Sequence, residues 1–113
     1  MITREIIQDM FDDVRTRSLF DIDAICCWGY FFTDHDRQRL VDAAPALEQH
    51  GYRFVSILEP APENDDQGLF FLHVEKLEHH TVDTLLARNV RLYTLARELG
   101  LETYDGMDVG PAK

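Results

Sequence analysis

The chain has 113 residues, of which 45% are hydrophobic and 11% are aromatic, a composition that suits one domain with a single core and excludes wholesale disorder. Its 21 Asp and Glu residues outnumber 11 Lys and Arg residues, which gives a formal net charge of -10. Such a charge repels the phosphate backbone of nucleic acids, so we expect no direct binding to RNA or DNA, whereas a basic protein would be attracted.

Segments that cross or target membranes are not expected. No run approaches the roughly twenty apolar residues of a transmembrane helix, and the N-terminal stretch "MITREIIQDMFDD" lacks the apolar core and cleavage site of a signal peptide. The two cysteines, Cys26 and Cys27, are neighbours whose side chains would point to opposite faces of a strand, so a disulfide between them is not expected. These features indicate a cytoplasmic protein.

An amphipathic helix is predicted at the start of the chain, over residues 1–18. Apolar residues recur there at three- and four-residue spacing, with aspartates between them: Ile6, Ile7, Met10, Phe11 and Val14. The next stretch, "LFDIDAICCWGYFF", has bulky apolar side chains at both odd and even positions. This pattern is typical of a strand that is covered on both faces or central in its sheet, and we place it near residues 21–32.

A second helix is predicted to begin at the pair Thr33 and Asp36, whose spacing matches a capping box. Gly51 should end it after His50, and Pro45 should either bend it or leave one turn irregular. Its core-facing residues would be Leu40, Ala43, Ala44 and Leu47.

Two strands, a third helix and a last strand follow. The stretches "YRFVSIL" (52–58) and "LFFLHVEKL" (69–77) are predicted strands, joined by the polar turn "EPAPENDDQG". Residues from Thr81 to Leu99 show the clearest helical period of the chain, and Gly100 should end this helix. A short strand and a turn are predicted in "LETYDGMDV" (101–109).

Together these elements predict an α+β fold. After the leading helix the order is strand, helix, strand, strand, helix, strand, which predicts a ferredoxin-like split βαββαβ domain with a four-stranded antiparallel sheet. Two helices would lie on one face of that sheet. The extra N-terminal helix would pack at an edge or on the open face, so that residues 1–113 form a single domain with its core in 20–109.

The stretch "HVEKLEHH" (73–80) raises the question of a metal site. His73 and Glu75 lie two residues apart on a strand and could share a face. His79 and His80, however, fall at the turn into the next helix, where adjacent side chains diverge. We therefore expect no metal and no other cofactor, and the turn histidines would instead hydrogen-bond the start of the helix. An enzyme that uses His73, Glu75 and His79 stays an alternative.

Other candidate functional residues are few. Cys26 or Cys27 could act as a nucleophile only beside a base, and their apolar neighbours favour a role as small buried hydrophobes. No nucleophile elbow or phosphate-binding glycine loop occurs in the sequence. Asn89 lies in the apolar stripe of the third helix, where its amide would either hydrogen-bond strand backbone or a nearby loop, or help specify an interface.

Three stretches carry a resemblance to a known family: "GYRFVSIL", "FFLHVEKLEHHTVDTLLARNVRLYTLARELG" and "LETYDGMDV". From about Ile25 to Val109 the chain resembles the regulator of ribonuclease activity B family, and the most telling part is the ending around Tyr104, Asp105 and Gly106. The resemblance implies a non-catalytic inhibitor that binds the scaffold region of ribonuclease E and changes which transcripts are degraded. An interaction or immunity-like module with another protein partner stays an alternative.

Partner contacts are expected in two segments. The polar turn is either a solvated loop or a docking loop, in which Glu63, Asp65 and Asp66 would meet the partner. At the ending, Gly106 would permit a turn with positive φ, and Tyr104 would anchor the strand in the core. In the other interpretation this ending contacts the partner directly, through Tyr104, Asp105, Met107 and Asp108.

Overall fold

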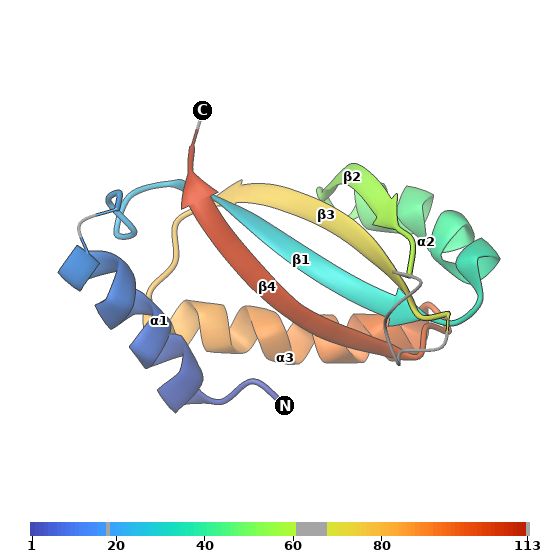
Figure 1. Ribbon diagram of the computed structural model, residues 1–113, viewed down its shortest axis with the longest axis horizontal. Coiled ribbons are helices and arrows are strands. Elements are labelled where there is room, and N and C mark those ends of the chain that lie inside the picture. Colours follow the sequence, from blue (N-terminus) through green and yellow to red (C-terminus); the bar gives the residue numbers. More distant parts are fainter. Residues whose placement is uncertain (18, 61–67, 113) are drawn as a thin grey trace.

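The computed structural model describes residues 1–17, 19–60 and 68–112. Along them run the elements α1 (Arg4–Arg17), β1 (Cys26–Asp34), α2 (Arg37–Gln49), β2 (Arg53–Leu58), β3 (Phe70–Glu78), α3 (Val82–Glu98) and β4 (Thr103–Pro111). The strands form one open sheet in the order β2-β3-β1-β4, and every neighbouring pair is antiparallel (Figure 1). The fold is therefore α+β, as the sequence predicts.

Helix α2 begins later than its predicted start. Thr33 is buried inside β1, where it pairs with both neighbouring strands, and Asp36 is the residue that caps the helix by accepting a hydrogen bond from the Gln38 amide at 3.0 Å. The prediction of a Thr33 cap is wrong because the strand's own pairing continues to Asp34. The predicted stop is confirmed, since Gly51 has a φ of 92° that favours glycine.

Helix α3 begins after Thr81, as predicted, and the structure shows a capping box at this start. The Thr81 hydroxyl accepts from the Thr84 amide, and the Thr84 hydroxyl accepts from the Thr81 amide. The helix is further fixed by His80, whose Nδ1 lies 3.0 Å from the Thr84 hydroxyl. The expectation that a turn histidine supports the helix start is therefore confirmed.

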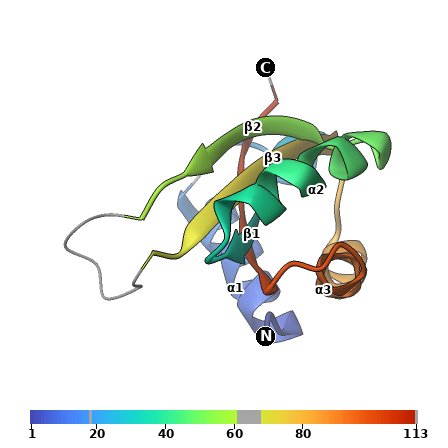
Figure 2. The ribbon, with the colours of Figure 1, turned by 90° about the vertical axis from the view of Figure 1, so that its right-hand side faces the viewer.

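The core lies between one face of the sheet and the helices. Side chains alternate across a strand, so Trp28, Tyr30 and Phe32 of β1 share one face, and all three are fully buried. Figure 2 shows α2 and α3 on the same side of the sheet. The core residues predicted for α2 are confirmed, because all of them are buried: Leu40, Ala43, Ala44 and Leu47.

Helix α1 packs beside α3 and extends the same core (Figure 1). The Phe11 ring stacks on Trp28 with the ring centroids 6.1 Å apart, and the amide of Ile2 donates to the Tyr93 hydroxyl at 3.1 Å. The prediction that this helix could cover the open face is wrong, since its apolar stripe joins the side that α3 already covers. None of the helices in the described residues lies on the other face.

Strand β4 carries an irregularity where a turn was expected. Tyr104 pairs with Phe32 and Gly106 pairs with Phe31, so Asp105 is the extra residue of a β-bulge. The predicted positive-φ turn at Gly106 is wrong, because that glycine continues the strand. The prediction for Tyr104 is confirmed: it is buried in the core.

Asn89 is buried under β4 and has a structural role. Its amide nitrogen donates to the Leu85 carbonyl at 2.8 Å and contacts the Met107 sulfur at 3.2 Å, and its oxygen accepts from the Tyr104 hydroxyl at 2.6 Å. The expected partners, strand backbone or a loop, are wrong. The side chain instead joins its own helix to side chains of β4, which satisfies a buried amide that would otherwise be costly.

Candidate functional site

The sheet face opposite the helices exposes large apolar side chains. Val55, Leu58 and Leu77 are 41%, 46% and 59% exposed. Because alternation places odd-numbered β1 and β3 residues opposite Trp28, this surface can be assigned from the strand register. We call it the open face, and it comprises Cys27, Gly29 and Phe31 of β1, Phe71, His73, Glu75 and Leu77 of β3, Arg53, Val55, Ser56 and Leu58 of β2, and Asp105, Gly106 and Asp108 of β4. The two bulge residues, Val55 and Asp105, are included because they line hollows on this face.

A charged row crosses the middle of the open face. Asp108, Gly29, Glu75 and Arg53 are cross-strand partners in four successive strands. Arg53 forms an ion pair with Glu75, whose side chain is only 14% exposed although no helix covers it. Asp108 has no ion-pair partner among the described residues. The row therefore has a neutralised pair at its β2 end and a free negative charge at its β4 end.

Gly29 makes room for two of these polar groups. A Cβ atom at this position would clash with the Asp108 carboxylate and would lie 2.8 Å from His73 Nε2. Both groups therefore lean over the glycine, which is buried although it is on the open face. His73 is also held by Phe31, whose ring stacks on the imidazole with centroids 4.4 Å apart. The side chains at the centre of the open face are thus held by close contacts with one another.

Two hollows lie on either side of this centre. The larger, of about 900 Å³, forms at the corner where β3 continues past the start of β2, and it is lined by Cys27, Gly51, Arg53, Phe54, Val55, Glu75, Lys76 and Leu77. The smaller, of about 410 Å³, is lined by Phe31, Leu58, Phe71, Asp105, Gly106 and Met107. Both hollows have apolar walls. The larger also contains Glu75 with two cations, Arg53 and Lys76, whereas the smaller contains one acidic residue, Asp105. The apolar walls suit apolar side chains of a protein partner, and a basic side chain is favoured only toward β4, at Asp105 and Asp108.

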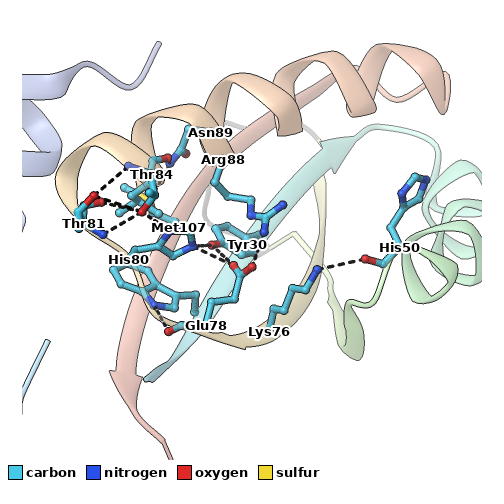
Figure 3. A network of polar contacts seen from close by, with 12 residues as sticks. Tyr30, His50, Lys76, Glu78, His80, Thr81, Thr84, Arg88, Asn89 and Met107 are labelled. Carbon is cyan, nitrogen blue, oxygen red and sulfur yellow. Dashed lines mark hydrogen bonds and ion pairs between the residues drawn. The ribbon is translucent and has the colours of Figure 1, made fainter. Parts of the chain in front are cut away.

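A second polar cluster is buried on the covered face (Figure 3). Tyr30, His80 and Arg88 converge on the Glu78 carboxylate: the Tyr30 hydroxyl donates at 3.1 Å, His80 Nε2 lies at 2.9 Å, and Arg88 forms an ion pair. Burial alone would raise the pKa of Glu78, but the hydrogen bonds from His80 and Arg88 outweigh it and hold that pKa at about 2. The charged glutamate is therefore satisfied within the fold, and the cluster joins β3 to α3.

The chemistry of the remaining candidates is limited. Burial raises the pKa of the Cys26 thiol, which disfavours the reactive thiolate. His73 and Glu75 share the open face as expected, while the exposed His79 follows β3 in the turn before α3. Across residues 1–17, 19–60 and 68–112, no three His, Cys, Asp or Glu side chains are grouped so that they could hold a metal ion.

The residues predicted to contact a partner fall into four settings. Glu63, Asp65 and Asp66 lie outside the described residues. Tyr104 is 1% exposed, so its side chain belongs to the core rather than to a surface. Met107 is half-buried against Asn89, whereas the last two are exposed on β4: Asp105 and Asp108.

Sequence reasoning missed most of the open face. The sequence pattern predicts strands that contain Arg53 and Leu77, and it offers His73 only as a candidate metal ligand. It does not indicate that these side chains share a surface. The odd-numbered positions of "FFLHVEKLE" carry Phe71, His73, Glu75 and Leu77, which alternate with the buried Leu72 and Val74. That alternation is a signal of a strand with one covered face, and it could have identified this surface.

Comparison with known proteins gives one family. The family described as "Regulator of ribonuclease activity B" matches residues 3–109, nearly the whole chain. Comparison with curated protein sequences gives no match. In the part of the chain that the structure describes, no helix is long and apolar enough to cross a membrane.

Proposed function

Because the chain belongs to the regulator of ribonuclease activity B family, we propose that it is a non-catalytic protein that binds ribonuclease E in its scaffold region and restrains RNA decay. The family match over residues 3–109 carries this proposal. The non-catalytic character rests on the family as well, since its description is that of a regulator. The proposed site of action is the cytoplasm, with no cofactor involved.

The fold supports a binding role for the chain. Its strand order, β4-β1-β3-β2 when taken from the other edge, suits a single ferredoxin-like domain over residues 1–113 with α1 added before the repeat. In this arrangement the helices lie on one side and leave the open face for a partner. Contacts through Glu63, Asp65, Asp66, Asp105, Met107 and Asp108 belong to the same proposal.

The charge of the chain supports a basic partner segment. A net charge of -10 raises the local concentration of basic protein segments near the surface and speeds their association. Exposed charges more than a Debye length apart, about 8 Å at physiological ionic strength, are screened. We therefore expect association with ribonuclease E to weaken as the salt concentration rises.

A cleavage assay with two forms of the nuclease tests the proposal. The purified chain is titrated against full-length ribonuclease E and against its isolated catalytic half, with a structured RNA as substrate, at low and high salt. We expect inhibition of the full-length enzyme alone, and weaker inhibition at high salt. Equal inhibition of both forms would contradict binding at the scaffold region, and no binding to either form would point to a different protein partner.

A further inference from the structure

The open face contains more negative charge than its own cation neutralises. Arg53 is paired with Glu75, so this glutamate adds little net charge to the surface. Asp105 and Asp108, both on β4, are exposed and have no ion-pair partner within the described residues. The open face therefore has a neutral apolar area toward β2 and an acidic margin along β4.

An apolar partner alone would fit this surface poorly. Covering the open face with hydrocarbon would bury the Asp108 carboxylate without a counter-charge, which is costly. An arginine or lysine above Gly29 would remove that cost, because Asp108 leans over this glycine from the β4 side. The partner's side chains next to this arginine or lysine would then reach the two hollows on either side.

A second copy of the chain is a poorer occupant. Each copy carries a net charge of -10, so two copies repel one another before contact. Stacking two open faces would also bring two acidic margins into one interface. Nucleic acid is disfavoured for the same reason, since its phosphates would approach Asp105 and Asp108.

We propose that the open face is the docking surface for a basic, apolar protein segment, with an arginine or lysine at Asp108 and flanking apolar side chains in the hollows at Leu77 and at Leu58. This proposal rests on the proposed function, because it identifies the face and the partner chemistry through which the chain would bind ribonuclease E. It assigns α1 and the outer surface of α3 no direct part in binding.

Substitutions on two surfaces test the assignment by binding titration against the purified scaffold half of ribonuclease E. The open-face variants are Leu58→Ser, Leu77→Ser and Asp108→Asn. The matched controls change equally exposed residues elsewhere: Ile6→Ser on α1, Val90→Ser on α3 and Asp9→Asn on α1. Each variant is first checked for an unchanged unfolding midpoint, so that loss of binding is not loss of fold.

The expected result is a difference between the two sets. Each leucine substitution should weaken binding by about tenfold, the effect of losing about 1.4 kcal/mol at an interface. Asp108→Asn should weaken it by about threefold and reduce its salt dependence. The controls should stay within about twofold of the wild type. Binding that is lost in the α1 or α3 controls and retained in the open-face variants would leave the proposed function in place and overturn this assignment.

A second measurement decides the case in which the wild type does not bind the ribonuclease at all. That result removes the proposed function, and the open face is then probed by NMR with a short peptide of alternating arginine and leucine. Chemical-shift changes confined to Gly29, Phe31, His73 and Leu77, and abolished when serine replaces leucine in the peptide, support the docking surface. Changes spread over α1 and α3 overturn it, as does a wild-type chain that sediments as a dimer while Leu77→Ser sediments as a monomer.

Discussion

The two faces of the sheet treat charge in different ways. On the covered face Glu78 is surrounded by Arg88, His80 and Tyr30, so that its charge is balanced by groups of the same chain. On the open face Glu75 has Arg53, but Asp108 is left unpaired among the described residues. Burial by the chain's own helices requires internal partners, because an unpaired charge there would oppose folding. The open face is exposed to water, which solvates an unpaired charge, so Asp108 can pair with a charge on another protein.

The largest loss of folding stability is expected when an aromatic residue of the covered face is removed. Trp28 projects from β1 and is fully buried under α1, where Phe11 stacks on it. Its indole nitrogen donates to the Glu78 carbonyl at 3.1 Å. Trp28→Ala should lower the free energy of unfolding by about 3–5 kcal/mol, from lost burial and the cavity that remains. Urea unfolding measures this. A loss under about 1 kcal/mol would mean that α1 collapses into the space or contributes little to the core.

The pairing of Glu78 predicts a specific dependence on pH. Its pKa is about 2 in the folded protein against an ordinary value of 4.5, so the folded state favours the charged form. The resulting stabilisation is fully present above about pH 4.5 and is lost as the pH falls toward 2. Glu78→Gln should therefore be less stable than the wild type by about 2 kcal/mol at neutral pH, less than for a fully buried pair because the Arg88 side chain is 25% exposed.

The same substitution should flatten the acid limb of the stability curve. The difference between wild type and Glu78→Gln should shrink between about pH 4.5 and pH 2, as measured by urea unfolding at each pH. The matched control is Glu98→Gln, which removes an ion pair with Arg91 on the exposed surface of α3 and should change stability little. A constant difference between wild type and Glu78→Gln across this range would contradict the internal pairing of Glu78.

The covered face was easier to predict from the sequence than the open face. Periodic apolar residues identified the helices, and Leu40, Ala43, Ala44 and Leu47 were placed in the core because burial leaves a 3.6-residue pattern. Thr33 and Gly106 were misplaced because strand pairing overrode local capping and turn preferences. The charged row could not be predicted, because Asp108 and Arg53 are placed at the two ends of one row only by the register of four strands. Short-range patterns carry no information on that register.

A smaller effect is expected at the glycine on which the open face is built. In Gly29→Ala the new methyl group would meet the Asp108 carboxylate and His73, so stability should fall by about 1–3 kcal/mol, as in other overpacked sites. Adding Asp108→Ala should recover part of that loss in the same urea assay. Gly110→Ala is the control, because a Cβ atom there meets nothing within 4 Å. An unstrained Gly29→Ala would show that these side chains move aside easily.

The smallest effect on stability, by contrast, is expected where the proposed effect on binding is largest. Leu77 is 59% exposed on the open face, whereas Leu72, in the same strand, is fully buried against the core. Leu72→Ser should cost several kcal/mol, from lost burial and an introduced hydroxyl, while Leu77→Ser should stay within about 0.5 kcal/mol of the wild type. Thermal unfolding of the two variants gives the comparison directly. If Leu77→Ser proves as destabilising as Leu72→Ser, the leucine is part of the fold and the open face is not free for a partner. If only Leu72→Ser unfolds early, alternate residues of β3 serve two purposes, with the core on one side and the partner on the other.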